Sequence, residues 1–563
     1  MKRILTFLLL CISINTAYSQ SAVPFVFEIQ EFQRTNAPGL QSFVLGHYND
    51  YWLLIGGRTE GMHGFPTPPL GGFPTMYANK NFIVYNPVTD SIWTRSIYQD
   101  FSIANAEQFR STNMQAYQTG NTLYLCGGYG KDSSLGSGLL DSFITFPKFT
   151  AINVSGMINA IKSNSSVSSF VRTLTDTTFA VTGGILGRIG NSYYLTVGQK
   201  FTGKYAFPNS GPPLFVQQYN NAIKKFDIVD NGVSLSITNK SYIVDTVNLH
   251  RRDLNVVPQI TSTSGTQSMT IYGGVFQYDE DVPFVNPVYI GANSISVENT
   301  FQQKYSQYEC PVIPIYDSVR NDMSNLFFGG ISLYRYDTLL HKSVIDTCDF
   351  GGPVPCVPFI SDITAITKFS NGTSKDSVLP IRFPSNRRLG AEQHMVYDAG
   401  LPRYSNDVVK LRSLSGRTFA GYLYGGIEAF EANPFLQMIS THGRNAGTVS
   451  VASNRIYKIY LTPNTVGINP LGSYVPADFK LFQNYPNPFN PTTRIKFDLP
   501  AGGFVSLKIY DVMGREVENL VNENLKAGSY EVEFSGVHKS SGIYYYKVYT
   551  EKYQETKKMI LVK

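Results

Sequence analysis

Residues 122–131 read TLYLCGGYGK, a short apolar strand that runs into two adjacent glycines and then a lysine. A phosphate-binding loop of the form G-x-x-x-x-G-K-[ST] surrounds a phosphate with backbone amides and its lysine. Lys131 follows Gly127 too closely for that spacing, which excludes such a loop here. The two glycines therefore need a structural explanation.

The same unit of an apolar strand followed by two glycines recurs six times. The copies are YWLLIGG (51–57), LYLCGG (123–128), FAVTGG (179–184), MTIYGG (269–274), NLFFGG (325–330) and GYLYGG (421–426), with the glycine pairs Gly56 and Gly57, Gly127 and Gly128, Gly183 and Gly184, Gly273 and Gly274, Gly329 and Gly330, and Gly425 and Gly426. Another strand-like segment precedes each copy, which predicts two antiparallel strands with a tight connection. Further strand candidates follow most copies. Four strands per repeat predict the blade of a β-propeller.

The pattern resembles the kelch repeat, whose hallmark is an apolar strand ending in Gly-Gly, followed by a tyrosine and then a tryptophan. The first copy carries the full set, with Gly56-Gly57, Tyr85 and Trp93, and the later copies are degenerate. The resemblance implies a six-bladed propeller over residues 20–464. We expect residues 23–33 to pair into the last blade beside residues 454–463, because this pairing covers strand edges that would otherwise be exposed.

The composition favours an all-β protein that is exported. Charged residues make up 16% and aromatic residues 13% of the chain, and the many glycines and tyrosines are typical of strands and turns. Residues 1–19 carry two basic residues, an apolar run and small residues before Gln20, as in a signal peptide. No other segment has the pattern of a transmembrane helix. The modest net charge of +6 comes without a basic run, so we expect no nucleic-acid partner.

Four cysteines remain after the signal peptide. Cys348 and Cys356 flank a turn-rich loop that an exported protein could close with a disulfide, and two unrelated loop thiols are the alternative. Cys126 lies in an apolar run and is interpreted as a small buried hydrophobic residue. No cysteine or histidine cluster has the spacing of a zinc site, so we expect no metal and no cofactor.

The last part of the chain has the pattern of a separate domain. Residues 465–479 are rich in proline, glycine and asparagine and predict a linker. Residues 480–563 alternate polar and apolar residues between short turns, which predicts a small immunoglobulin-like β-sandwich of about seven strands.

This segment closely resembles the type A C-terminal sorting domain of the type IX (Por) secretion system of Bacteroidetes. The matching motifs are NYPNPFNPTT (484–493), IYDVMGREV (509–517), AGSYEVEF (527–534), SGIYYYKV (541–548) and KKMILVK (557–563). The resemblance implies that residues 480–563 engage the secretion machinery, and that the protein is exported to the cell surface or the extracellular space.

Ligands of propellers usually bind over the central channel, where the loops of all blades converge. The candidate residues at this channel mouth are Arg34, Arg58, Arg110, Arg251, Arg252, Arg387, Arg388, Glu392 and His394. Clustered arginines suit the recognition of carboxylate, sulfate or phosphate groups. Alternatively, these arginines stack on aromatic rings and hold adjacent blades together through loop carbonyls. His394 alternates within an apolar strand and is interpreted as structural.

These observations favour an exported propeller that binds a glycan or a protein. No G-x-S-x-G or H-E-x-x-H motif is present, and no catalytic residue is assigned. The alternative is a secreted kelch-type carbohydrate-active enzyme, either a sugar oxidase or a sugar isomerase resembling a mutarotase. An oxidase would need copper ligands that include histidines such as His63, His394 and His442, whose convergence the sequence does not decide.

Overall fold

The computed structural model describes residues 23–64, 72–135, 142–206, 208, 211–262, 264–349, 353–434, 449–463, 469–470, 475–536 and 539–563. The expected signal peptide lies outside these residues. The chain divides into two compact units, Phe25–Pro463 and Asn464–Lys563. The protein is all-β, and its described α-helices are α1 (Ile103–Ala106) and α2 (Val154–Lys162). Neither helix is long and apolar enough to span a membrane.

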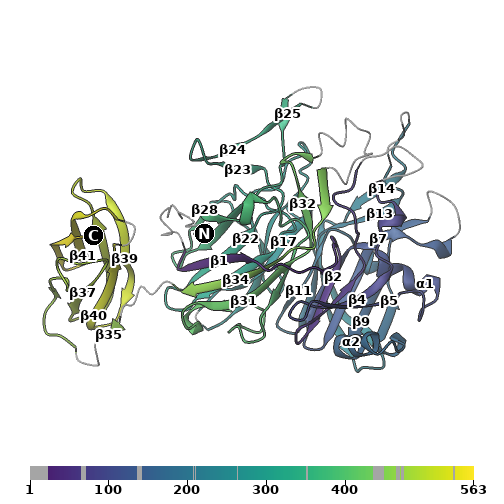
Figure 1. The fold of residues 1–563 in the computed structure, drawn as a ribbon, viewed down its shortest axis with the longest axis horizontal. Helices are drawn as coiled ribbons and strands as arrows, with labels where there is room; N and C mark the ends of the chain where they lie inside the picture. Colours follow the sequence, from purple (N-terminus) through teal and green to yellow (C-terminus); the bar gives the residue numbers. More distant parts are fainter. Residues whose placement is uncertain are drawn as a thin grey trace, which may run out of the picture. The chain divides into compact units, whose positions relative to one another are not determined.

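The described part of the first unit is built on six antiparallel sheets, each with four core strands in a regular order (Figure 1). The first three sheets contain β2 (Val44–Tyr48), β3 (Tyr51–Ile55), β4 (Asn81–Asn86) and β5 (Ser91–Ser96); β6 (Thr112–Thr119), β7 (Thr122–Lys131), β9 (Lys148–Asn153) and β10 (Val171–Thr175); and β11 (Ile185–Ile189), β12 (Ser192–Thr196), β15 (Ala222–Asp230) and β16 (Leu235–Val244).

The strands of the other three sheets are again given in their order across the sheet. We call the first strand of each sheet the inner strand and the last the outer strand. These three sheets contain β17 (Arg252–Ile260), β18 (Gln267–Val275), β19 (Val288–Ile290) and β20 (Ile295–Val297); β21 (Val312–Asp317), β22 (Asp322–Phe328), β27 (Asp362–Lys368) and β28 (Ser374–Arg382); and β29 (His394–Tyr397), β31 (Thr418–Tyr424), β34 (Ile456–Pro463) and β1 (Phe25–Glu31).

Additional strands extend or flank these sheets. They are β8 (Phe143–Thr145), β13 (Gln199–Gly203) and β14 (Phe215–Tyr219) on the second sheet, β30 (Val409–Lys410) on the fifth, and the pairs β23 (Tyr334–Asp337) with β24 (Lys342–Ile345), β25 (Thr347–Asp349) with β26 (Pro353–Pro355), and β32 (Ile427–Ala429) with β33 (Ser450–Ala452).

The N-terminal strand pairs where the sequence predicted. β1 runs antiparallel to β34, with Phe25 opposite Pro463 and Glu31 opposite Tyr457. Figure 1 shows the purple β1 beside the green β34. The sixth sheet is therefore assembled from both ends of the first unit.

Each sheet packs against the next sheet along the chain. From the first sheet to the fifth, the apolar clusters include Leu53 with Leu125, Cys126 with Leu195, Tyr194 with Leu254, and Val257 with Phe327. Phe27 of the sixth sheet contacts Phe328 of the fifth, with ring centroids 6.0 Å apart. Tyr424 of the sixth sheet contacts Trp52 of the first, at 5.1 Å. The sixth sheet thus touches both the fifth and the first.

The double glycines connect neighbouring sheets. Five pairs lie within the second strand of their sheet or directly after it, and both glycines of each of these pairs have positive φ. In four of these pairs the second glycine donates its N–H to a carbonyl in the segment before the next sheet, as in Gly128 to Val181 at 3.0 Å and Gly426 to Leu40 at 2.9 Å. A side chain at Gly127 would meet the Val181 carbonyl oxygen, with Cβ only 1.8 Å away. Glycine is required there by both backbone conformation and space.

The structure corrects the position of the third copy. Gly183 and Gly184 precede β11, the first strand of the third sheet, instead of ending a second strand. The second strand of that sheet is β12, and the pair that follows it is Val197-Gly198, with φ of 49° and 80°. Gly198 donates its N–H to Arg251 O at 3.0 Å, as the second glycines do elsewhere. The sequence concealed this copy because a valine occupies a position that favours glycine.

The C-terminal unit consists of two four-stranded antiparallel sheets around one core. Its strands are β35 (Asn469–Pro470), β36 (Lys480–Leu481), β37 (Thr492–Leu499), β38 (Gly503–Tyr510), β39 (Glu516–Leu525), β40 (Gly528–Ser535), β41 (Gly542–Thr550) and β42 (Gln554–Leu561). Ile495, Leu507 and Tyr546 are among the buried residues that fill the space between the sheets. The alternating pattern of the sequence therefore gives one apolar face per sheet.

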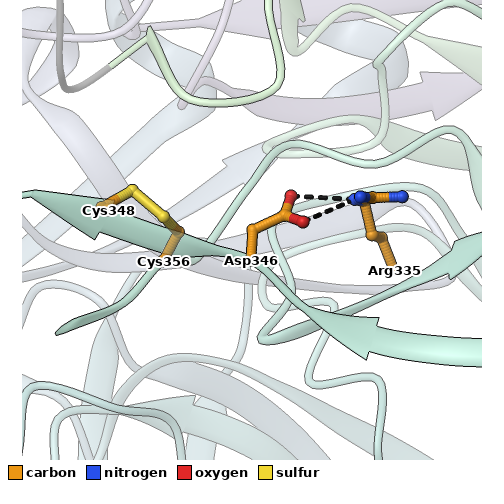
Figure 2. The surroundings of a disulfide bond; sticks show 4 residues. All are labelled: Arg335, Asp346, Cys348 and Cys356. Carbon is orange, nitrogen blue, oxygen red and sulfur yellow. Dashed lines mark hydrogen bonds and ion pairs between the residues drawn. A yellow bond between two sulfur atoms is a disulfide. The ribbon is translucent and has the colours of Figure 1, made fainter. Parts of the chain in front are cut away.

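A disulfide joins the two cysteines that the sequence paired. Cys348 and Cys356 are bonded across the β25–β26 pair, with Cα atoms 5.4 Å apart. Figure 2 shows the neighbouring ion pair, in which Arg335 Nε donates to both carboxylate oxygens of Asp346 at 2.8 Å. Cys126 and Cys310 are buried free thiols.

Candidate functional site

The inner strands of all six sheets line one cavity of about 400 Å³. Its walls include Val44 of β2, Met114 of β6, Leu186 of β11, Val256 of β17, Val312 of β21 and His394 of β29. The inner strands begin at one end of the cavity, and the glycine pairs lie at this end too. We call it the double-glycine end. The opposite end, where the inner strands turn into the second strands, is the hairpin end.

One residue with positive φ stands at the start of each inner strand. These residues are Ser42, Asn113, Gly183, Asp253, Glu309 and Glu392. Backbone bonds link consecutive sheets at this level: the N–H of Asn113 donates to Ser42 O at 3.1 Å, and the N–H of Glu392 donates to Glu309 O at 2.8 Å. The repeated conformation brings a ring of mostly polar side chains to the double-glycine end of the cavity.

Three of the six ring positions carry carboxylates. Glu309 and Glu392 hydrogen-bond to each other, and Asn113 Nδ2 donates to Glu392 Oε1 at 2.8 Å. Burial, together with the negative charge of the neighbouring carboxylates, raises the pKa of Glu309 and of Glu392. The two glutamates can therefore share one proton. Such a group accepts hydrogen bonds from ligand hydroxyls or amines, and it can also exchange a proton.

The predicted arginines at this end are already paired, which agrees with the structural alternative. Arg58 forms an ion pair with Glu60 and donates to Pro74 O at 2.9 Å. Arg110 forms an ion pair with Glu107. Arg251 is 1% exposed and lies over the ring of Phe284, with its guanidinium carbon 4.3 Å from the centroid. Its nitrogens donate to three carbonyls at 2.8–2.9 Å. Burial lowers the pKa of Arg251 to about 9.

The remaining arginines also have protein partners. Arg252 pairs with Asp253 and donates to the Tyr219 hydroxyl at 3.2 Å. Arg387 forms an ion pair with Glu428 at 2.7 Å, and Arg388 donates to Phe430 O at 3.0 Å. Of these three arginines, Arg252 contacts the carboxylate ring through its ion pair with Asp253. The structure does not gather the arginines into one anion site.

Arg34 lies elsewhere. Its Nε donates at 2.5 Å to Pro87 O in the β4–β5 turn, and its guanidinium carbon is 3.5 Å from the centroid of the Phe32 ring. Because β4 is antiparallel to β3, this turn is at the hairpin end of the first sheet. The prediction that placed Arg34 at the channel mouth with the other arginines was wrong, since the chain crosses between sheets before it enters β2.

His394 connects the sixth sheet to the first. Its Nε2 is 2.8 Å from Phe43 O, and the two rings are 4.5 Å apart. Burial lowers the pKa of His394 to about 4, so the ring is neutral near pH 7 and Nε2 donates to the carbonyl. His63 packs against Phe73, and His442 lies outside the described residues. Within the described part of the chain, no group of three histidine, cysteine, aspartate or glutamate side chains could hold a metal ion.

The sequence missed Asn113, Asp253 and Glu309 as members of the ring. Each stands directly before or at the start of an inner strand, at the position that Glu392 has in the sixth sheet. Aligning the residue before each inner strand across the repeats would have found them. The search for arginines overlooked this position because the residue type changes from sheet to sheet.

The C-terminal unit is identified by its sequence. Residues 483–563 match the family model of the secretion system C-terminal sorting domain. The sorting domain confirms the expected resemblance and indicates export by type IX secretion to the cell surface or the extracellular space. It covers only the end of the chain, and the first unit is outside the match.

The other comparisons are weaker. No curated protein sequence matches the chain. Among solved structures, YjhT is 12% identical and covers 70% of this chain and 92% of its own, with a TM-score of 0.37. A fungal alcohol oxidase of the AA5 family in complex with copper is 10% identical, with a TM-score of 0.35. The match covers 96% of this chain and 100% of the oxidase chain. PorZ, a surface component of the type IX secretion system of Porphyromonas gingivalis, is 10% identical, with a TM-score of 0.13. The match covers 95% of this chain and 100% of the PorZ chain. Likenesses at these TM-scores carry no argument about fold or function.

Proposed function

We propose that the protein is an exported binding protein whose first unit is a six-bladed kelch-like β-propeller. Six sheets in chain order, each packed on the next, with the sixth also contacting the first, support this architecture. Tyr85 and Trp93 of the kelch pattern lie on the third and fourth strands of the first sheet. The compact sandwich of the sorting domain is proposed to be immunoglobulin-like.

The observation that carries the binding function is the cavity lined by the inner strands of all six sheets. At its double-glycine end, Glu309 and Glu392 line the cavity and offer hydrogen-bond acceptors, and Asn113 offers a donor. Glycans present many hydroxyl donors, and proteins present amines, so both ligand classes suit this ring. The paired arginines leave little free positive charge there. We therefore favour a neutral glycan or an amine-bearing ligand over a sulfate or phosphate.

The proton-sharing glutamates favour a second candidate, acid–base catalysis on a sugar. Two carboxyl groups with raised pKa values can exchange a proton with a substrate hydroxyl at neutral pH. Under this candidate, Glu309 and Glu392 would act on the ring-opening or epimerisation of a sugar. No redox step is part of it.

Glycan binding by the mature full-length chain tests the site. A glycan array is expected to show selective binding that Glu392→Gln weakens, because the amide cannot share the proton of Glu309. Arg34→Met is the control variant, since Arg34 is outside the ring. Binding that is indifferent to Glu392→Gln would contradict the ring as the ligand site. If NMR shows that a bound sugar interconverts and that Glu392→Gln stops the reaction, the catalytic candidate replaces simple binding.

Deletion of residues 480–563 tests the export route separately. We expect the shortened protein to remain in the periplasm, because the sorting domain is the part that the secretion machinery recognises. Cell fractionation with detection of the first unit measures this, and retained folding is checked by protease resistance. Normal delivery of the shortened protein to the surface would refute the assignment.

A further inference from the structure

The hairpin end of the cavity is built differently from the double-glycine end. Where β2 and β3, β6 and β7, and β11 and β12 meet, two-residue turns connect the strands. In the sixth sheet, residues 398–417 connect β29 to β31 and contain β30, which pairs in parallel with the inner strand β21 of the fifth sheet. Asn406 in this connection donates from Nδ2 to Gln259 O in the fourth sheet at 3.1 Å. The connection therefore crosses the hairpin end from sheet to sheet.

A second cavity of about 540 Å³ adjoins the central one at this point. Tyr117 of β6, Arg188 of β11 and Asn406 line both cavities. Gly190, Gln267 and Ser405 complete part of the wall of the second cavity. The three shared residues come from different sheets, so the fold holds them together at the junction of the two cavities.

Two of these shared residues carry polar atoms without a partner. Asn406 is only 4% exposed, and within the described residues its Oδ1 accepts no hydrogen bond. The buried Nε of Arg188 likewise finds no acceptor there. Buried polar atoms are nearly always hydrogen-bonded in folded proteins, and exceptions point to a missing ligand or water. A ligand between these residues would have to supply one donor and one acceptor.

The charges at the junction favour an anionic group. The Asp407 carboxylate is neutralised by Arg403, with Nη1 and Oδ1 2.5 Å apart. Arg188, in contrast, has no carboxylate partner among the described residues; its Nη2 donates to the neutral Asn191 Oδ1 at 3.2 Å. A guanidinium without a counter-ion binds carboxylates well, because the two groups match in charge and geometry. Tyr117 lines both cavities together with Arg188 and carries a hydroxyl.

From this geometry we propose a second ligand site at the hairpin end, which binds a small carboxylate-bearing polyol between Arg188, Tyr117 and Asn406. The ligand carboxylate accepts from Arg188, and a neighbouring ligand hydroxyl donates to Asn406 Oδ1. This ligand class differs from the neutral or amine-bearing ligand proposed for the double-glycine end. The two proposals rest on different residues, so failure of either leaves the other standing.

Calorimetric titration of the mature full-length chain tests the site, with sodium D-galacturonate and sodium D-gluconate as carboxylate probes and D-galactose as the neutral probe. At matched ionic strength, at least one carboxylate is expected to bind, and at least roughly tenfold more tightly than galactose. Arg188→Met is expected to weaken that binding by roughly tenfold to a hundredfold, because it removes a charge-assisted hydrogen bond. Tyr117→Phe should weaken it by roughly threefold. Arg34→Met serves as the control, because Arg34 lines neither cavity.

Three results would overturn the proposal. They are no binding of either carboxylate, equal binding of galactose and galacturonate, and unchanged affinity in both Arg188→Met and Tyr117→Phe. Thermal unfolding of each variant shows whether it is folded, and Tyr117→Phe decides the matter if Arg188→Met is not. If the cavities hold only water, none of the probes binds and the proposal fails.

Discussion

The two ends of the central cavity use polar residues in different ways. At the double-glycine end, Arg58, Arg110 and Arg251 are held by carboxylates or carbonyls of the protein. At the hairpin end, Arg188 lines two cavities without a carboxylate partner among the described residues. Arginines therefore stabilise the fold at the double-glycine end, and at the hairpin end we propose that Arg188 binds a ligand.

This difference follows from the backbone at each end. The double-glycine end brings loops from every sheet together, so many carbonyls converge and need donors. Arg251 satisfies three of them at once. At the hairpin end, the first three sheets have two-residue turns, and the longest described connection is that over residues 398–417. Arg188 stands beside one of these short turns, and its described side-chain hydrogen bond goes to Asn191 within that turn.

The largest expected effect concerns the glycines that join the sheets. Gly127→Ala should lower the free energy of unfolding by more than about 4 kcal/mol or abolish folding, because the new Cβ would collide with the Val181 carbonyl. Gly120 also has positive φ, but a side chain there meets nothing within 4 Å. Gly120→Ala should therefore cost only about 1 kcal/mol. Chemical denaturation of both variants measures the difference, and equal losses would show that the joint is not sterically constrained.

The repeat and the sorting domain could be predicted from the sequence, because both depend on local patterns. Apolar alternation and glycine pairs mark strands, and the pairing of β1 with β34 follows from the need to cover an edge. The third copy was misplaced because Val197 adopts the backbone conformation that glycines have in the other copies. One substitution at a repeat position thus hid a strand pair from the pattern.

The candidate site was less predictable, because it depends on contacts between distant residues. Whether Arg251 binds a ligand or a carbonyl is decided by Gly273 and Asn286, which the sequence does not place near it. Asn406 reaches the cavity through an insertion without a recognisable motif. Glu309 and Glu392 meet only because the fifth and sixth sheets are adjacent. Residue types alone could not distinguish the arginines that have carboxylate or carbonyl partners from Arg188, which has no carboxylate partner among the described residues.

The most direct test of the contrast between the two ends is the unfolding free energy of Arg251→Met and Arg188→Met, measured side by side by chemical denaturation without ligand. Arg251→Met removes the donors of three hydrogen bonds to loop carbonyls and should cost roughly 3 kcal/mol. Arg188→Met removes a charge that no described carboxylate neutralises and should change stability by less than about 0.5 kcal/mol. Similar losses in the two variants, or a larger loss for Arg188→Met, would contradict the division of roles between the two ends.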